Sequence, residues 1–376
     1  MQRQKSTTSV LIVGNTLESA DLRYVAGYRT SDPIVYAQVA GHGHLVVSAM
    51  DKAWAAQCAP GLTVWSPQDL TLSKAMRRRL SDWAFALLSK LGASRVQVPA
   101  TFPLGVAQRL ARRGVRLDVA AAGVFPQRRV KSADEVARIR QSQRAAVAGM
   151  RAAWALLRAA APDARGMLMH NGAPLTGEQV RRAINVAAMA YDCVGGEPIV
   201  SCGEQSADPH GIGGGPLQAG EPIIIDIFPQ HAFTGYCGDL TRTVCKGPPK
   251  PGLRAMHAAV AAAQRLALAT VRAGVYGSTV HHVVQAEFER RGYKNEVVNG
   301  RPAGFIHSTG HGVGLEIHEA PSLGLRPDRL QAGAIVTVEP GLYYPGMGGV
   351  RIEDTVLVTR QGAELLVPCA RGLVIA

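Results

Sequence analysis

Acidic residues interrupt some of the most apolar segments of this chain. Asp226 divides the run III-D-IF, Glu339 ends the run IVTV, and Glu353 follows VRI. A carboxylate flanked by Ile and Val faces a buried or half-buried place, where an unpaired charge costs several kcal/mol or is neutralised by a pKa shift. We therefore expect a cation beside these acids, and this requirement constrains the fold that can hold them.

Two arginines in the same segments, Arg242 and Arg351, could pair with such acids. They are too few for the set, which consists of Asp226, Asp239, Glu339, Glu353 and Asp354. One acid alone is better explained as a capped or salt-bridged structural residue. The whole set indicates one or two divalent metal ions, because hard cations prefer oxygen ligands.

Histidines supply the nitrogen ligand that such a site often includes. His307, His311 and His318 lie in the segment FIHSTGHGVGLEIHEAP, whose interspersed glycines suit a tight backbone around a site better than a helix. His210, in ADPHGIGGG, is a weaker fourth candidate. One histidine alone would more often be structural, so the prediction depends on the cluster.

The chain of 376 residues is long enough for about two domains. Short apolar runs at 10–14, 34–40, 44–50 and 95–100 predict strands, and the spacing over 73–91 predicts a helix that ends at Gly92. Residues 1–127 therefore read as a small α/β domain. The segment 125–132 reads as a linker.

A repeated order of elements marks the remainder of the chain. Ser132 with Glu135 and Thr176 with Gln179 form capping boxes for a long and a shorter helix. Strands are predicted at 198–202, then at 222–228 paired with 235–245. The same order recurs as helices at 252–273 and 279–291, followed by strands at 305–309, 334–340 and 349–359. This recurrence predicts two similar halves around a shared cleft between sheets.

Composition excludes several classes of protein. The net charge is +13, but the arginine runs lack interleaved aromatic residues, so we predict a solvated surface and no nucleic-acid partner. No run of 18 apolar residues and no signal peptide is visible, which predicts a protein without a membrane association. Six scattered cysteines are expected to be reduced thiols. A cytoplasmic location is the resulting expectation.

Four segments resemble the signature segments of the pita-bread metallopeptidases, family M24: GYCGDLTRT, FIHSTGHGVGLEIHEAP, TVEPGLYY and GVRIEDT. The family includes prolidase, the Xaa-Pro aminopeptidases and methionine aminopeptidase. The resemblance covers about residues 130–376, and 21–33 is more weakly similar to the N-terminal domain of the prolidase and creatinase branch. It implies an α+β fold. A pita-bread (creatinase/aminopeptidase-like) domain at 128–376, with pseudo-two-fold halves around a curved antiparallel sheet, follows the smaller α/β domain at 1–127.

The resemblance also implies a site with two divalent metal ions. Asp226 would bind one metal, His311 and Glu339 the other, and Asp239 and Glu353 would bridge both. A hydroxide shared by the two metals, its pKa lowered by both, could then attack a carbonyl at neutral pH. Manganese suits this oxygen-rich set with one nitrogen, and cobalt, zinc or iron are alternatives.

Further roles follow from the same resemblance. Glu339 would carry a proton from the attacking water to the leaving nitrogen, and His318 would stabilise the developing oxyanion. His210 is a third catalytic candidate. The residues expected to contact substrate are His210, His307, His318, Arg351 and Tyr343.

The implied reaction is exopeptidase cleavage of Xaa-Pro bonds in short proline-containing peptides, of the dipeptidase or the aminopeptidase type, by a homodimer. A methionine aminopeptidase-like enzyme is disfavoured, because that enzyme usually lacks an N-terminal domain of this size. A creatinase-like amidinohydrolase is disfavoured because that branch has lost the metal ligands. A catalytically inactive binding module with this fold would usually have lost them as well.

One departure from the family pattern concerns the segment between the first two ligands. Asp226 and Asp239 lie 13 positions apart, two more than in many members, so the tip of the predicted hairpin is longer. An even insertion preserves the alternation of side chains along a paired strand. Both carboxylates can therefore still face one site, and the rim of the cleft is where a difference is expected.

Overall fold

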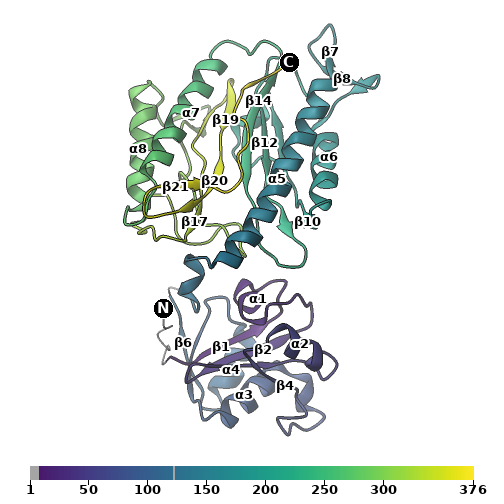
Figure 1. Cartoon of the computed structure of the whole chain (residues 1–376), viewed down its shortest axis with the longest axis vertical. Coiled ribbons are helices and arrows are strands. Elements are labelled where there is room, and N and C mark those ends of the chain that lie inside the picture. Colours follow the sequence, from purple (N-terminus) through teal and green to yellow (C-terminus); the bar gives the residue numbers. More distant parts are fainter. Residues whose placement is uncertain (1–7, 122) are drawn as a thin grey trace. The chain divides into compact units, whose positions relative to one another are not determined.

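A computed structural model of the chain describes residues 8–121 and 123–376. The chain divides into two compact units, Met1–Pro126 with Phe233–Gly235 and Gln127–Ala232 with Tyr236–Ala376 (Figure 1). Each unit is described by itself below. Among the described residues, no helix combines the length and apolar character that crossing a membrane requires.

The first unit is built on a mixed six-stranded sheet with the order β4-β3-β2-β1-β5-β6. Its strands are β1 (Val10–Gly14), β2 (Ile34–Val39), β3 (His42–Val46), β4 (Thr63–Trp65), β5 (Arg95–Val98) and β6 (Arg116–Val119). Its helices are α1 (Ala20–Ala26), α2 (Lys52–Cys58), α3 (Leu80–Lys90) and α4 (Leu104–Ala111). Successive residues of β1 enter two separate apolar clusters, one on each side of the sheet. Burial on both faces explains why its sequence is a continuous apolar run.

The predicted helix over 73–91 is shorter than expected. Met76–Arg78 form a 3-10 turn, and the α-helix begins only at Leu80. Arg77 Nε donates to the Leu72 carbonyl and the Trp83 indole donates to the Arg77 carbonyl, so these polar groups tie down a turn where the apolar spacing alone predicts a helix.

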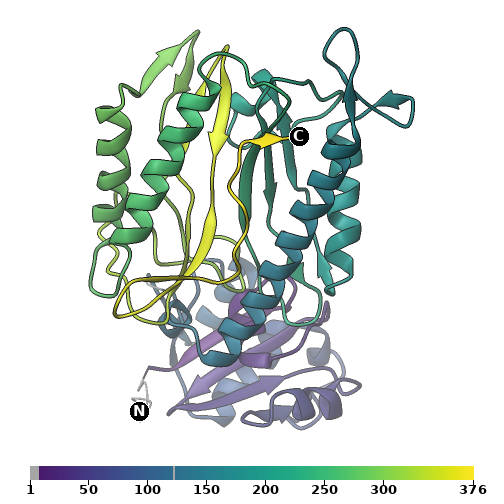
Figure 2. The ribbon, with the colours of Figure 1, turned by 45° about the horizontal axis from the view of Figure 1, so that its top comes forward.

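The second unit consists of two helix pairs and the strands between them. Its long helices are α5 (Ala133–Ala159), α6 (Gly177–Met189), α7 (Leu253–Thr270) and α8 (Gly277–Arg290). Both predicted capping boxes are present, at Ser132 and at Thr176. In Figure 2, α5 and α6 flank the teal strands, and α7 and α8 flank the yellow ones. This is the repeated order that the sequence predicts.

The first half of this unit carries the sheet β11-β12-β14-β22. These strands are β11 (Ile199–Cys202), β12 (Ile223–Ile227), β14 (Leu240–Lys246) and β22 (Val374–Ile375). The same stretch of chain contains shorter elements: β7 (Ala161–Pro162), β8 (Leu168–His170), β9 (Ala173–Pro174), β10 (Cys193–Val194), the 3-10 turn η3 (Gly203–Ala207) and β13 (Gln230–His231). The antiparallel pairing of β12 with β14 confirms the predicted hairpin.

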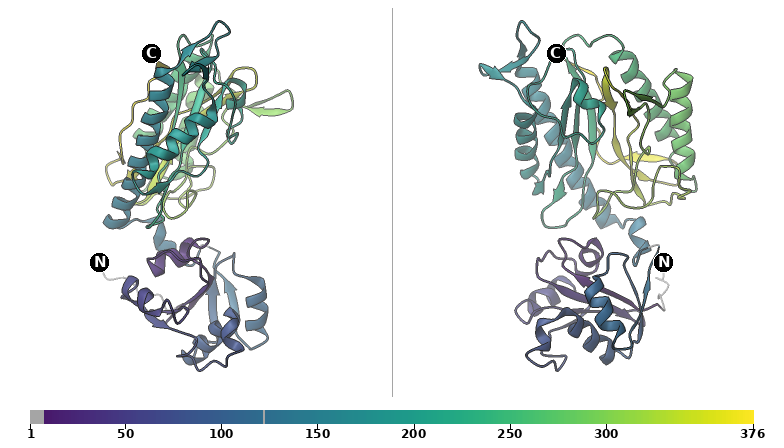
Figure 3. Two further views of the ribbon diagram at one scale, coloured as in Figure 1. Left: turned by 90° about the vertical axis from the view of Figure 1, so that its right-hand side faces the viewer. Right: turned by 180° about the vertical axis from the view of Figure 1, so that it is seen from behind.

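The second half carries the sheets β17-β20-β21 and β18-β19. These strands are β17 (Ile335–Val338), β18 (Gly341–Tyr344), β19 (Gly348–Arg351), β20 (Asp354–Val358) and β21 (Ala363–Leu365). A separate hairpin, β15 (Glu296–Val298) with β16 (Arg301–Ala303), projects from the body of the unit in the left view of Figure 3. From behind, the same figure shows the strands in front of the long helices, which cover one face of the curved sheet. The other face, which these four helices leave uncovered, is called the open face below.

Hydroxyl groups of β14 join the two halves. Thr243 Oγ1 donates to the Arg351 carbonyl (3.0 Å) and accepts from the Arg351 amide (2.9 Å). The Glu353 amide donates to the Thr241 carbonyl at 3.0 Å. The strand predicted over 349–359 is therefore two strands, because the chain turns at Ile352 and Glu353 to leave β18 and pair with β17.

The strand predicted at 305–309 is absent from that part of the described chain, where Phe305–Thr309 form bends and loop. Gly304 has φ +101°, a conformation open mainly to glycine, and it ends the short bridge to Tyr343. The Thr309 amide then donates to the Leu323 carbonyl at 3.0 Å, so the segment pairs with a neighbouring loop. The histidine-bearing segment is held by irregular contacts instead of by a ladder.

Candidate metal centre

Alternation along the first hairpin brings two acids to the open face of the sheet. Asp226 in β12 pairs in register with Thr241 in β14, while their neighbours Ile225 and Ile227 pack into the core beneath α5. Asp239 lies just before β14. Gln143 on α5 fixes its backbone twice, donating to its carbonyl and accepting from its amide at 2.8 Å each, and Thr355 donates to the same carbonyl. The longer hairpin thus keeps both carboxylates on one side.

The second half contributes the other three predicted ligands. Glu339 follows β17, and its amide donates to the Thr309 carbonyl at 2.8 Å. His311 lies in the adjacent glycine-rich loop, where its amide donates to Thr337 Oγ1 at 3.0 Å. Glu353 lies at the turn between β19 and β20, where its Oε2 accepts a hydrogen bond from Thr241 Oγ1 at 2.7 Å. Each ligand candidate is therefore positioned by backbone contacts to a neighbouring element.

The five side chains line one cavity. His311 Nε2 lies 3.1 Å from Glu339 Oε1 and 3.7 Å from Asp239 Oδ2. One ligand atom from each of Asp239, His311 and Glu353 lies within 4.8 Å of the others. His311 Nδ1 lies 3.2 Å from the Gly312 carbonyl oxygen, which assigns a proton to Nδ1 and directs Nε2 toward the carboxylates.

The electrostatics of this cluster call for a cation. Burial, and then the negative charges of Glu353, Asp226 and Glu339, raise the pKa of Asp239 well above its usual value. Burial and the charges of Glu339 and Asp226 do the same to Glu353. Among the described residues, Asp226 Oδ1 and Glu353 Oε1 are buried without a hydrogen-bond partner. Buried acceptors without a donor are costly, and divalent ions bind such oxygens. The residues therefore fit a metal site.

Glu339 and His311 behave as a pair within this cluster. Burial is the largest single influence on Glu339 and raises its pKa. The hydrogen bond and charge interaction with His311, together with the charges of His307 and Arg351, outweigh burial and lower the pKa to about 2. Burial lowers the pKa of His311, and the contact with Glu339 reverses that effect, so the net pKa is raised. Glu339 is thus held as an anion, the form that binds a cation.

The pairing of acids with arginines corrects one part of the sequence argument. Arg351 Nη2 binds Asp226 Oδ2 at 2.7 Å and Arg242 Nη2 binds Asp354 Oδ1 at 2.8 Å. A third arginine, Arg371, also binds Asp354, at 2.7 Å. The structure therefore provides one more arginine partner than the two that the sequence suggests. The excess of acids persists, because two of these three arginines neutralise Asp354 outside the cluster.

A series of hydrogen bonds links Arg351, Tyr343 and His307 next to the cluster. Arg351 Nη1 donates to the Tyr343 hydroxyl at 2.7 Å, and that hydroxyl lies 2.9 Å from His307 Nε2. Burial raises the pKa of Tyr343 to about 12 and lowers the pKa of His307. Tyr343 is completely buried behind the cavity wall, so it holds Arg351 and His307 in place and does not itself reach the cavity.

The cluster opens into a cavity of about 690 Å³. Its walls include the candidates His210, His307, His318 and Arg351. The His318 ring stands edge-on to the His311 ring, with 4.3 Å between centroids. The remaining wall residues, which the sequence does not single out, are Glu197, Ile199, Pro209, Ile212, Phe228, Ser308 and Ile317. Ile199 pairs with Asp226 across β11 and β12, so the register of these strands places Ile199 on the face that carries the metal ligands. Knowledge of this register would have identified Ile199 as a wall residue.

The sequence of the chain is similar to those of known peptidases. The sequence model described as Metallopeptidase family M24 matches residues 137–360. The chain is 37% identical over 179 residues to the uncharacterized peptidase YqhT of Bacillus subtilis (47% of this chain, 48% of that protein). It is 36% identical over 179 residues to the Xaa-Pro dipeptidase of Pyrococcus furiosus (47% and 49%). The matched segment thus spans about half the length of these curated relatives.

Among solved structures, the chain resembles the Xaa-Pro dipeptidase from Bacillus anthracis. The TM-score is 0.82 at 24% sequence identity, covering 98% of this chain and 95% of that one. This likeness confirms the predicted pita-bread architecture.

Proposed function

Since the chain belongs to metallopeptidase family M24, we propose that it is a two-metal exopeptidase that hydrolyses Xaa-Pro bonds in short peptides. The observation that carries the proposal is that Asp226, Asp239, His311, Glu339 and Glu353 line one partly apolar cavity, where two buried carboxylate oxygens lack a donor among the described residues. The name of the Pyrococcus furiosus relative, Xaa-Pro dipeptidase, supports the choice of substrate.

The ligands divide between two ions in this proposal. Asp226 would hold one ion, His311 and Glu339 would hold the other, and Asp239 and Glu353 would contribute to both. The metals, manganese in the first instance, would supply an activated water and a Lewis acid for the scissile carbonyl. The charge balance supports two ions, because four carboxylates line one cavity and Arg351 is the one arginine or lysine among the described residues that lines it with them.

The chain's own residues complete the reaction. Glu339 accepts the proton of the attacking water and delivers it to the proline nitrogen, which leaves as an amine. His318 and His210 donate to the oxygen that becomes negative as the carbonyl carbon turns tetrahedral. Burial and then the proximity of His311 lower the pKa of His318, which suits a neutral donor. His307 and Arg351, held by Tyr343, orient the substrate.

The rest of the cavity supports a small substrate. Ile199, Ile212, Phe228 and Ile317 supply apolar wall for a side chain and a proline ring. A cavity of this size lies in the range that holds a molecule of a few residues. A cytoplasmic homodimer remains part of the proposal, on the grounds of the family resemblance and of the six cysteines, all of which are free thiols.

Hydrolysis of defined peptides tests the proposal. The full chain, stripped with a chelator and reloaded with Mn²⁺, Co²⁺ or Zn²⁺, is incubated with Gly-Pro, Ala-Pro and an Xaa-Pro-Xaa tripeptide. Matched peptides with alanine in place of proline are the controls. We expect metal-dependent cleavage of a proline peptide and little cleavage of its alanine counterpart.

The pattern of cleavage separates the alternatives. Cleavage of the tripeptide without the dipeptides indicates the aminopeptidase type, and the reverse indicates a dipeptidase. Release of methionine from a peptide without proline would replace the proposal with the methionine aminopeptidase reading. No cleavage of any peptide with any metal would refute the enzyme and favour a binding module.

A further inference from the structure

Glu353 and Asp354 are consecutive acids that point to opposite faces of the sheet. Glu353 lines the cavity, whereas Asp354 pairs in register with Val338 and faces α7. Both side chains are buried, with 1% of each residue exposed. Contacts that fix the backbone between Glu353 and Asp354 therefore also fix the position of the Glu353 carboxylate in the cavity.

Arg242 contacts this backbone from the helix-covered face of the sheet. The strand places it on the core face, opposite to its neighbours Thr241 and Thr243. Its Nη1 donates to the Glu353 carbonyl and, at 2.8 Å, to the Thr241 carbonyl. Thr241 in turn donates to the Glu353 carboxylate at 2.7 Å. One guanidinium thus holds the main chain of Glu353 and of the residue that orients its side chain.

The remaining donors of Arg242 are also used. Its Nη2 donates to Asp354 Oδ1 at 2.8 Å and to the Cys369 carbonyl at 2.9 Å, and its Nε donates to the Ala370 carbonyl at 2.7 Å. A guanidinium has five N–H groups in a fixed planar fork, and here each has an acceptor. Lysine, with one nitrogen and three donors, cannot reproduce this pattern.

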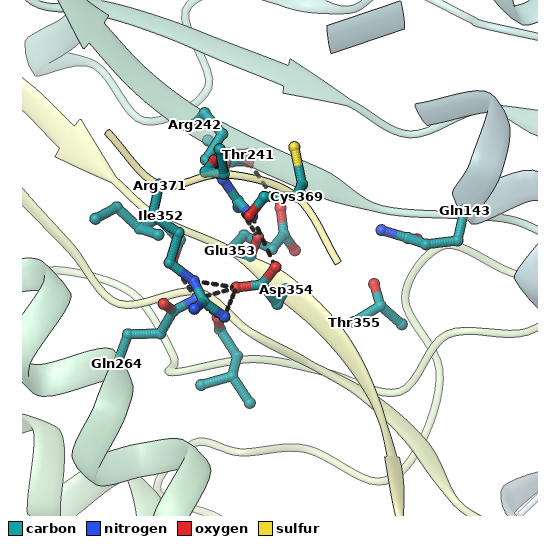
Figure 4. A network of polar contacts seen from close by, with 12 residues as sticks. Gln143, Thr241, Arg242, Gln264, Ile352, Glu353, Asp354, Thr355, Cys369 and Arg371 are labelled. Atoms are coloured by element: carbon teal, nitrogen blue, oxygen red, sulfur yellow. Dashed lines mark hydrogen bonds and ion pairs between the residues drawn. The ribbon is translucent and has the colours of Figure 1, made fainter. Parts of the chain in front are cut away.

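Asp354 is held from the other side as well. Figure 4 shows Gln264, Arg242 and Arg371 converging on its carboxylate. Gln264 Nε2, on α7, donates to Asp354 Oδ2 at 2.8 Å and to the Ile352 carbonyl at 3.3 Å. Arg371 adds two contacts to Oδ2 from the segment near the C-terminus. The turn that carries Glu353 is therefore fixed on both flanks.

We propose that Arg242, braced by Asp354, is the positioning residue that sets the Glu353 carboxylate for metal binding. The inference rests on the proposed role of Glu353 as a metal ligand. Arg242 does not reach the cavity, so it acts through the backbone. Groups that orient a metal ligand from behind typically change metal affinity about 10- to 100-fold when they are replaced.

The test compares Arg242→Lys with Arg140→Lys in the full chain. Both substitutions keep a positive charge. Arg140 binds the Leu366 carbonyl and Glu364 at the surface of the same unit, outside the cavity wall. Mn²⁺ is titrated into chelator-stripped protein by calorimetry, and circular dichroism in EDTA confirms that each variant is folded. We expect Mn²⁺ affinity to fall about 10- to 100-fold in Arg242→Lys and by less than twofold in Arg140→Lys.

Turnover gives a second readout that a general loss of packing would not produce. Raising the Mn²⁺ concentration should restore much of the activity of Arg242→Lys, because the ligands themselves are intact. Folded Arg242→Lys with unchanged Mn²⁺ affinity would overturn the inference, as would an equal loss in Arg140→Lys. Absence of Mn²⁺ binding by the unaltered protein would instead refute the proposed metal site.

A second variant covers the possibility that Arg242→Lys does not fold. Asp354→Asn keeps the size of the side chain and the acceptor for Arg242, but it removes the charge and turns an amide toward Gln264 and Arg371. We expect it to fold and to bind Mn²⁺ more weakly than the unaltered protein. Failure of both variants to fold would assign the cluster to overall stability and contradict a specific role in positioning.

Discussion

On the open face of the curved sheet, Glu353 keeps one carboxylate oxygen without a donor among the described residues. On the helix-covered face, the next residue, Asp354, is bound by Arg242, Arg371 and Gln264. The two acids are equally buried, so burial does not distinguish them. The supply of partners does distinguish them: the charge of Asp354 is already compensated by cations of the chain, whereas Glu353 has an oxygen available to an added cation.

The largest expected effect comes from removing the acid on the open face. Glu353→Gln keeps the shape of the side chain but removes the charge that the metals would share. We expect hydrolysis of the proline peptide to fall to background and the bound metal to decrease, since one amide oxygen cannot replace a shared carboxylate. Activity is measured with excess Mn²⁺, and metal content by elemental analysis after gel filtration.

Folding of the same variant sharpens the contrast between the faces. Glu353→Gln should unfold in EDTA at a temperature no lower than the unaltered protein, because it loses a repulsive charge. Asp354→Ala should unfold markedly earlier, because it leaves Arg242 buried without its counter-ion; breaking such a pair costs about 3–5 kcal/mol. Similar unfolding temperatures for the two variants would mean that the faces do not differ as described.

Part of this contrast could be predicted from the sequence. The runs III-D-IF, IVTV-E and VRI-E-D place acids in apolar segments and indicate a site for a cation. They do not separate Glu353 from Asp354, because the chain turns between β19 and β20 and strand alternation does not continue across that turn. The capping boxes at Ser132 and Thr176 set the starts of two helices by local chemistry alone, and both are present. Where the rule is local, a single sequence suffices.

Long-range contacts set the limits of such prediction. Arg371 lies 17 positions from Asp354, in a segment without a motif, and its role depends on how the chain returns to the sheet. The cavity residues Glu197 and Phe228 flank β11 and β12, and the pairing of these two strands brings them to the same cavity. The 305–309 segment has strand-like composition, but Gly304 and its contacts with a neighbouring loop prevent a ladder. These features depend on contacts between distant segments of the chain, and the periodicity of the sequence does not predict such contacts.

A smaller effect is expected from a residue that faces the ligands without being one. His318→Ala removes the proposed donor to the developing oxyanion, and such donors contribute about 10²- to 10³-fold to turnover. The metals should remain, since His318 contacts His311 edge-on and not the carboxylates. Steady-state kinetics and metal content measured on the same sample check this. Loss of metal from His318→Ala would show that it acts on the ligand set and not on the substrate.

The smallest expected effect concerns the stability of the metal-free protein. Burial and the charges of Glu353, Asp226 and Glu339 raise the pKa of Asp239, with Arg351 opposing them. A carboxyl whose pKa is higher in the folded chain than in the unfolded one, where it is about 3.9, favours folding while it is protonated. That contribution is complete below the unfolded pKa and is lost as pH rises through the folded pKa. In EDTA, Asp239→Asn should therefore unfold at a higher temperature than the unaltered protein at pH 7.5.

The difference between these two proteins should shrink as pH falls toward 4.5, because Asp239 then carries a proton and resembles the amide. Comparing the variant with the unaltered protein at each pH cancels the other titrating groups, His311 and the remaining histidines among them. Excess Mn²⁺ at pH 7.5 should reverse the order, since only the unaltered protein gains a shared ligand. A difference that is independent of pH, or an order that Mn²⁺ leaves unchanged, would mean that the open face carries no uncompensated charge and resembles the face that holds Asp354.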